Sequence, residues 1–286
     1  MYEVVWQYDE TTPFEDVKPA DADEARRLLL DGNLNFSNLF SPHLGTGNTS
    51  RQFVRISPQD VGLSATPGEP PPQEPFAAFL SCADARVPVE LIFGQQANDL
   101  FVVRVAGNVL GDEGLGSLGF AVDQLGSVRL LVALGHTGCG AVTAAVDAYL
   151  TPVGYLGVAA NFPLQAIVGK VAAAVNGAAH ALVSAHGNSV TSLPGYRQAL
   201  IEASVILNAA LSGAILAHNF QDALGPRLQV LFGVYDLRHR TVGLPAAGQT
   251  DGWLPGLFAP PTTQDAFVDF GGQVARSWLV ADLLRG

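Results

Sequence analysis

Charged side chains are scarce in this sequence. Only 14% of its 286 residues are Asp, Glu, Lys or Arg, while 48% are hydrophobic. So little charge predicts a large core, or an interface between subunits that removes further surface from water. The 15 basic residues are outnumbered by 26 acidic ones, which gives a net charge of −11. Because an acidic chain is repelled by phosphate backbones, we expect no nucleic-acid partner.

Cysteine is scarcer still. Two cysteines in a chain of this length exclude a disulfide-stabilised secreted domain. The start, MYEVVWQYDE, lacks a basic region followed by an apolar segment, so we expect no signal peptide and a cytoplasmic protein. The apolar stretch of residues 155–183 is interrupted by Pro163, Lys170, Asn176 and His180. We interpret this stretch as buried or amphipathic helix and expect no membrane span.

Changes in composition divide the chain into three parts, without internal repeats. Residues 1–75 form an N-terminal arm with a helix and, from residue 41, a Pro-rich loop that ends in TPGEPPPQEP. Residues 76–244 form a core whose Ala-rich insert lies near 150–193. Residues 245–286 form a C-terminal extension with two weak helix signals, TQDAFVDF and VARSWLVADLLR. The core is therefore the part in which we look for a functional site.

Several helices and one irregular segment are expected outside the central strands. Residues 1–20 look polar and irregular. The next segment, 21–36, is predicted as a helix that begins at an Asp and that Gly32 can end. Residues 195–220 predict another helix, either long or broken near Gly213.

Short apolar runs dominate the core. FAAFLSC, DLFVVRVAG and SVRLLVALGH are rich in Val, Leu and Phe, and segments long enough for crossover helices separate them. Such runs are typical of a parallel sheet that is buried on both faces. The segment RLQVLFGVYDLRHRTVGL predicts a further strand, a turn and a final strand. We therefore predict an α/β fold: a mostly parallel central sheet of about four strands plus an antiparallel edge strand, flanked by helices, with an N-terminal helical arm.

Both cysteines and one histidine fall at the ends of predicted strands. Cys82 follows FAAFLS, and GHTGCG places His136 and Cys139 on one glycine-flanked turn after a later strand. Ligands gather at the carboxyl ends of parallel strands, so these three side chains can converge. Two thiolates and an imidazole suit zinc, and three protein ligands leave a fourth position for water, as in catalytic sites.

Other interpretations of these residues stay open at this point. A free cysteine is often a small buried hydrophobic residue, and a lone histidine is often structural. A Cys82–Cys139 disulfide is the main structural alternative to a metal site, and it could form if metal were lost. Asp84 and Arg86, which follow Cys82 at alternate positions, could be a structural ion pair at a strand end.

The motifs in their order resemble the beta class of carbonic anhydrases. CADARVPVELIF, DLFVVRVAGNV, SLGFAVDQLG and GHTGCGAV are similar to that family's conserved segments, continuously from about Gln73 to Val142. The resemblance implies one zinc ion held by Cys82, His136 and Cys139. It also implies a homo-oligomer, a dimer or a dimer of dimers, because the family builds its sites in dimers. The sequence departs from the family pattern at Ala85 and at several polar positions around the site.

The resemblance also assigns roles to residues around the metal. It implies that Asp84 and Arg86 form the catalytic dyad. Gln73 falls where the family has a glutamine that binds substrate, and Phe101 where an aromatic side chain lines the carbon dioxide pocket, typically across a subunit interface. The backbone at Gly138 is expected to face substrate.

We therefore predict reversible hydration of carbon dioxide to bicarbonate and a proton, with a zinc-bound hydroxide oriented by Asp84 and Arg86. One alternative is a carbonyl sulfide or carbon disulfide hydrolase on the same scaffold. Another is a zinc-binding scaffold protein with weak catalysis or none. A proton shuttle is not identified. The candidates are His180, His186, His218 and His239, but each is also explained as an ordinary polar residue, and buffer could do the same job.

Overall fold

The computed structural model describes residues 2–8, 18–39, 50–57, 59–62, 68–151, 162–247 and 252–286. The strands are β1 (Tyr2–Tyr8), β2 (Ser50–Ile56), β3 (Ala77–Ser81), β4 (Leu100–Arg104), β5 (Leu130–His136), β6 (Gln229–Asp236), β7 (Thr241–Pro245) and β8 (Trp253–Pro255). The α-helices are α1 (Ala22–Leu39), α2 (Val89–Ile92), α3 (Asp112–Gln124), α4 (Gly140–Leu150), α6 (Phe162–His186), α7 (Tyr196–Asn219), α8 (Gln264–Ala275) and α9 (Trp278–Arg285). Short 3-10 helices cover Gln59–Val61, Ala106–Asn108, Asn188–Ser192 and Gln221–Ala223.

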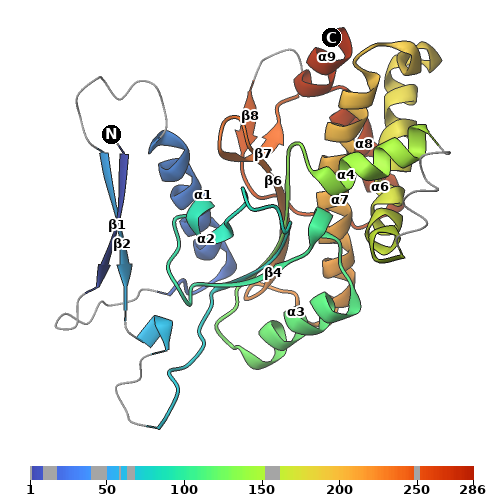
Figure 1. Ribbon diagram of the computed structural model, residues 1–286. Helices are drawn as coiled ribbons and strands as arrows, with labels where there is room; N and C mark the ends of the chain where they lie inside the picture. The colour runs from blue at the N-terminus through green and yellow to red at the C-terminus, as the bar shows by residue number, and fades with distance from the viewer. Residues whose placement is uncertain are drawn as a thin grey trace.

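The predicted α/β fold is confirmed. Six strands form one sheet in the order β4-β3-β5-β6-β7-β8. The first four run parallel, and β7 and β8 are antiparallel to their neighbours. β7 is the antiparallel strand that the sequence predicted, and β8 is an additional strand from the C-terminal extension. The helices cover both faces of the sheet (Figure 1).

Alternate residues of the central strands enter two separate hydrophobic cores. Ala78 and Leu80 of β3 face the core formed with α3, α4, α6 and α7. Ala77 and Phe79 face the core formed with α1 and α2. Because successive side chains of a strand point to opposite faces, a strand buried on both sides reads as an unbroken apolar run. The run FAAFL therefore fixed both the strand and its central place in the sheet.

The N-terminal arm differs from the prediction. Residues 2–8, which were expected to be irregular, form β1, and the expected Pro-rich loop contains β2. The two strands pair in parallel, with Tyr2 opposite Ser50 and Tyr8 opposite Ile56, in a sheet of their own. A strand needs a partner to satisfy its backbone, and here that partner lies far away in the chain, where a local pattern cannot reveal it. The remainder of this loop lies partly outside the described residues.

Two helices continue through a glycine: α1 past Gly32, which was expected to end it, and α7 through Gly213, so that the long alternative holds. α1 begins as predicted, with Asp21 Oδ1 accepting the Glu24 N–H at 2.8 Å, but it runs past Gly32 to Leu39. A Cβ at Gly32 would lie 1.8 Å from the Phe93 carbonyl oxygen, so glycine here permits close packing. α7 continues through Gly213, where a Cβ would come within 3.1 Å of Pro260.

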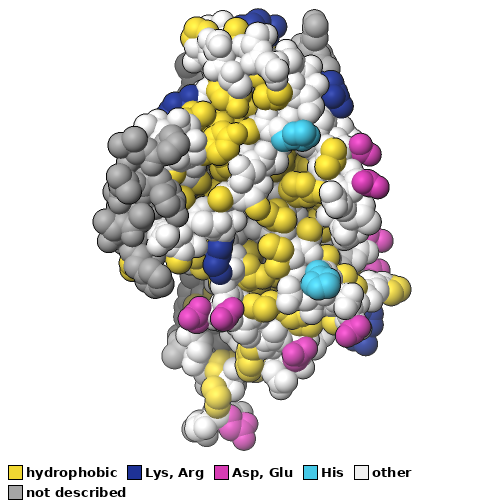
Figure 2. All heavy atoms as spheres, turned by 90° about the vertical axis from the view of Figure 1, so that its right-hand side faces the viewer, with side chains coloured by type: hydrophobic (Ala, Val, Ile, Leu, Met, Phe, Trp, Pro, Cys, Tyr) yellow, Lys and Arg dark blue, Asp and Glu magenta, His cyan; other side chains and the backbone are white. Residues whose placement is uncertain are grey.

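The Ala-rich insert and the C-terminal extension both pack on the core. α6 contacts α4, α7 and α8, and α9 contacts α7. Residues 152–161 of the insert lie outside the described residues. α6 and α7 are long and apolar enough to cross a membrane by length and composition, but 83% of the most apolar window of α7 is buried inside the fold, against 44% for α6. Figure 2 looks onto the side where α4, α6 and α8 lie and shows many apolar side chains among few charged ones.

Candidate metal centre

Strand register brings the predicted ligands together. Ser81, the last residue of β3, pairs with Leu134 of β5, so Cys82 comes level with Gly135 and next to His136. Cys139 follows one turn later as the residue that precedes α4. The ligand atoms of Cys82, His136 and Cys139 all lie within 4.8 Å of one another. The convergence that the sequence predicted is confirmed.

The donor atoms of these residues are free to hold a metal ion. The two cysteines are buried and not disulfide-bonded, and their Sγ atoms lie 3.9 Å apart. His136 Nδ1 lies 3.0 Å from the Thr137 carbonyl oxygen, so it carries the proton and donates there. Nε2 is buried and has no hydrogen-bond partner among the described residues. An unpartnered imidazole nitrogen beside two thiols fits zinc, which the sequence predicted.

The two thiols control each other's protonation. The hydrogen bond with Cys139 is the largest cause that lowers the pKa of Cys82, to about 4; burial opposes this shift, and backbone N–H groups assist it. The Cys82 sulfur in turn raises the pKa of Cys139 above its ordinary value. One proton is therefore shared between the sulfurs, and a cation among the three ligands would replace it.

Asp84 and Arg86 pair at the rim of the ligand cluster. Arg86 Nε donates to Asp84 Oδ1 at 3.0 Å, and Nη2 donates to Oδ2 at 2.6 Å. This bidentate pair is the main reason that the pKa of the Asp84 carboxyl is held well below its usual range. Asp84 Oδ2 also lies 3.8 Å from His136 Nε2. An ionised carboxylate thus stands next to the ligand atoms.

Arg104 holds the backbone that carries Cys82 and Asp84. From the end of β4, its Nε donates to the Cys82 carbonyl at 3.0 Å and its Nη2 to the Asp84 carbonyl at 2.5 Å. The guanidinium therefore fixes both peptides of the segment between ligand and dyad. Arg104 lies in the motif DLFVVRVAGNV, but the sequence alone indicated no role for it.

Two buried acids contact the turn between His136 and Cys139. The Gly138 N–H points inward and donates to Glu202 of α7, at 3.2 Å to Oε1 and 3.4 Å to Oε2. Thr137 Oγ1 donates to Asp236, at the end of β6, at 3.1 Å. Burial is the main cause that raises the pKa of Glu202 to about 7. The Gly138 N–H is thus already hydrogen-bonded to Glu202. The predicted contact between the Gly138 backbone and substrate stays a prediction.

Glu202 was not among the predicted site residues, although the sequence carries a signal for it. Glu202 is the only acid in a 24-residue helix that is otherwise mostly apolar and buried. Burying a carboxylate is costly unless it is hydrogen-bonded, so an acid in such a helix indicates a specific partner. Asp236 and its neighbours gave no such signal, because strand ends are commonly polar.

Gln73 precedes β3 and Phe101 pairs near its amino end, whereas Cys82 follows its carboxyl end. Phe101 pairs with Ala78 near the amino end of β3, four residues before Cys82, which is about 13 Å along a strand. Gln73 is exposed and precedes β3. Their predicted substrate contacts stay predictions; for Phe101 the family resemblance implied a contact across a subunit interface.

The four candidate histidines have different surroundings. His239 Nδ1 lies 2.5 Å from Asp236 Oδ2, which links it through Asp236 to Thr137 in the ligand turn. His186 Nε2 contacts the Ala275 carbonyl at 2.7 Å, and His180 lies 3.5 Å from Ser184. His218 is exposed near the end of α7. Of these four histidines, His239 is the one linked to the ligand turn by the hydrogen bonds given above, through Asp236.

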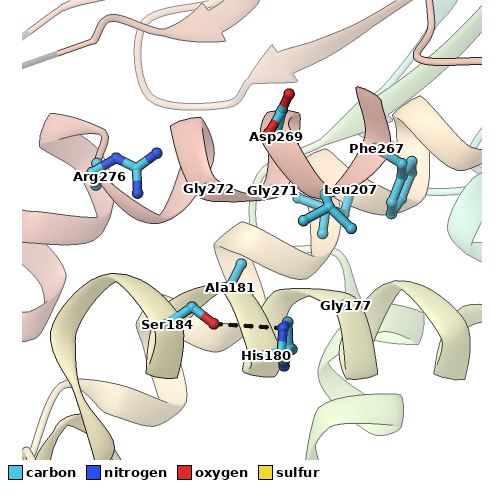
Figure 3. Close-up of a pocket in the computed structure, with 11 residues that line it drawn as sticks. Gly177, His180, Ala181, Ser184, Leu207, Phe267, Asp269, Gly271, Gly272 and Arg276 are labelled. Carbon is cyan, nitrogen blue, oxygen red and sulfur yellow. Dashed lines mark hydrogen bonds between the residues drawn. The ribbon is translucent and has the colours of Figure 1, made fainter. Parts of the chain in front are cut away.

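A pocket of about 240 Å³ between α6 and α8 lies apart from this centre. Small residues such as Gly177 and Gly271 line it, with His180, Asp269 and Arg276 at its edge. In Figure 3 the side chains of Asp269 and Arg276 point in different directions and do not converge with His180. The pocket therefore shows no arrangement for chemistry comparable to that of the ligand cluster.

Comparison with known proteins agrees with the motifs. The family model of carbonic anhydrases matches residues 77–210, which include the three ligands, Asp84, Arg86 and Glu202. Carbonic anhydrase 2 of Mycobacterium tuberculosis is 45% identical over 101 residues, covering 35% of this chain and 48% of that protein. The carbonic anhydrase of Mycolicibacterium smegmatis is 47% identical over 76 residues, covering 27% and 36%. The chain thus spans about half the length, or less, of these relatives.

Among solved structures, the beta-carbonic anhydrase CcaA is similar with a TM-score of 0.46 and 21% identity, covering 68% of this chain and 84% of that one. The resemblance predicted from the motifs is confirmed over the matched segment, which contains the complete ligand set.

Proposed function

We propose that this protein catalyses the reversible hydration of carbon dioxide to bicarbonate and a proton, with zinc held by Cys82, His136 and Cys139. The observation that carries the proposal is the position of Asp84 at this ligand set. Both oxygens of its carboxylate accept hydrogen bonds from Arg86, and Oδ2 lies 3.8 Å from the ligand nitrogen of His136. An ion pair with a purely structural purpose would not need this position.

Zinc, when bound, supplies a Lewis acid that lowers the pKa of water from about 15.7 toward about 7. Asp84 has the task of orienting the attacking water. Because Arg86 holds the pKa of Asp84 low, the carboxylate is ionised near neutral pH and can only accept a hydrogen bond. A hydrogen bond from the water to Asp84 leaves an oxygen lone pair directed at the carbon of carbon dioxide.

The reaction needs no oxidant or reductant. The water oxygen forms a bond to carbon while one C=O bond gives its electron pair to its oxygen, and one water proton leaves to solvent or buffer. Arg104 supports the geometry because it fixes the carbonyls of Cys82 and Asp84. These two hydrogen bonds hold the segment that carries Asp84 beside the ligand cluster.

We further propose a homo-oligomer, a dimer or a dimer of dimers, in which a neighbouring subunit completes the pocket. Gln73 is exposed, and Phe101 lies half-buried on β4, an edge strand of the described sheet. Phe101 pairs with Ala78, four residues before Cys82, which places it about 13 Å along the strand from that ligand. The low charge content of the sequence also supports an interface that buries surface.

Zinc stoichiometry and stopped-flow hydration of carbon dioxide across the neutral pH range test the proposal, beside sulfide release from carbonyl sulfide. We expect one zinc per chain and hydration well above the buffer rate. One zinc per chain without hydration would contradict the proposal and favour a scaffold protein. Carbonyl sulfide hydrolysis that exceeded carbon dioxide hydration would favour the related hydrolase.

A further inference from the structure

We propose that Glu202 and Asn208 of α7 are positioning residues for the zinc ligands. Each is buried, with 7% and 2% of its surface exposed, and each hydrogen-bonds a different turn beside a ligand. Glu202 contacts the turn that carries His136 and Cys139, and Asn208 contacts the turn beside Cys82. The inference rests on the metal site of the proposed function and not on the reaction.

Glu202 sets the direction of the peptide between two ligands. Its Oε1 accepts the Gly138 N–H at 3.2 Å and the Gln198 side-chain amide at 3.0 Å. Gly138 has a φ of +66°, a backbone conformation that residues other than glycine rarely adopt. Without the acceptor, this inward N–H would lose its partner, and the turn would have to rotate to satisfy it. His136 and Cys139 flank the turn and would move with it.

Asn208 acts on the remaining ligand through Gly107. The Asn208 side-chain amide donates to the Gly107 carbonyl at 2.7 Å, and the Gly107 N–H donates to Cys82 Sγ at 3.3 Å. Ser212, one turn further along α7, donates to the neighbouring Asn108 carbonyl at 3.0 Å. The helix thus aims a backbone N–H at a sulfur that must carry negative charge to bind a cation.

A packing role alone does not account for these side chains. A buried carboxylate and amide cost desolvation energy that an apolar residue in the same helix would avoid. Ser204 of the same helix shows the contrast, because its buried Oγ has no hydrogen-bond partner among the described residues. One helix therefore hydrogen-bonds the turns beside both halves of the ligand set, and ligand orientation depends on such hydrogen-bonded neighbours.

The test compares four variants of the full chain with the wild type. Glu202→Met and Asn208→Leu keep bulk but remove the hydrogen bonds; Glu202→Gln keeps an acceptor oxygen; Ser204→Ala is the matched control. Zinc affinity is measured by chelator competition, the cobalt-substituted protein gives the thiolate charge-transfer band, and the metal-free protein gives a melting temperature. We expect zinc affinity about 10- to 100-fold weaker and an altered cobalt band for Glu202→Met and Asn208→Leu. Glu202→Gln should be nearly normal and Ser204→Ala unchanged.

Several outcomes would overturn the inference. Zinc affinity unchanged in Glu202→Met and Asn208→Leu would do so, as would an equal loss in Glu202→Gln, Glu202→Met and Ser204→Ala. A lower melting temperature with normal metal affinity would show a structural role only. If Glu202→Met did not fold, Asn208→Leu would decide the question. A wild type that binds no zinc would overturn the proposed function as well, which distinguishes the two failures.

Discussion

Arg86 and Asp84 form a fork in which Nε lies 3.0 Å from Oδ1 and Nη2 lies 2.6 Å from Oδ2. The same geometry occurs on the surface, where Arg197 of α7 holds Asp147 of α4 at 2.7 and 2.9 Å. The two pairs differ in their surroundings, because Asp84 stands beside the ligand His136 and Asp147 is half exposed. This difference provides a matched control for the catalytic role.

Asp84→Asn should abolish most hydration activity while zinc stays bound. The amide can donate a hydrogen bond to the attacking water and is not attracted as strongly by Arg86, so orientation is lost; we expect a fall of about 10²-fold or more. Asp147→Asn should leave activity unchanged and cost about 1 kcal/mol of stability or less, since exposed pairs contribute little. Stopped-flow rates and zinc content check both. Equal activity of Asp84→Asn and the wild type would remove Asp84 from the mechanism.

Removing the metal should make the two cysteines prone to oxidation. Their Sγ atoms lie 3.9 Å apart, and the low pKa of Cys82 supplies the reactive thiolate. Metal-stripped protein treated with diamide should lose both titratable thiols and regain them with a reductant. Zinc-loaded protein should resist the same treatment. Persistence of two free thiols in the metal-free protein would show that the backbone cannot bring the sulfurs to bonding distance.

Glu202 should make the metal-free protein less stable as pH rises. Its pKa in the fold is about 7 against an ordinary value of 4.5, so the folded state binds more protons than the unfolded state between these values. The stabilising contribution is present below about pH 4.5 and is lost as pH rises through about 7, by on the order of 3 kcal/mol. The contribution of Glu202 is measured as the difference in the free energy of unfolding in urea between the wild type and Glu202→Gln across this pH range. A constant difference between the two proteins would show that Glu202 does not titrate there.

Gly195→Ala should destabilise the protein, because α9 packs against the start of α7. A Cβ at Gly195 would lie 1.7 Å from the Leu283 carbonyl oxygen, so backbone must move, at a cost of roughly 1–3 kcal/mol. Gly116→Ala in α3 is the control: nothing lies within 4 Å of its Cβ position, and alanine favours helix by up to about 1 kcal/mol. Thermal unfolding measures both. A neutral Gly195→Ala would indicate that the C-terminal helix packs only loosely on α7.

The sequence by itself determined the central sheet and the chemistry of the metal centre. Buried parallel strands need continuous apolar runs, and FAAFL and LLVALG show them directly. Cys82, His136 and Cys139 could be placed together because the carboxyl ends of parallel strands meet at one edge. Asp84 and Arg86 could be paired because they are close in sequence.

Tertiary structure decided everything that depended on a distant partner. The pairing of β1 with β2, the need for glycine at Gly32 and the packing of α9 on α7 each rest on contacts between residues far apart in the chain. The same holds for Arg104, Glu202 and Asn208, whose hydrogen bonds reach across 20 to 101 residues. A local pattern specifies which atoms can bind a metal. Only the packed helix and strands specify what holds those atoms in place, since hydrogen-bond direction is set where separate elements meet.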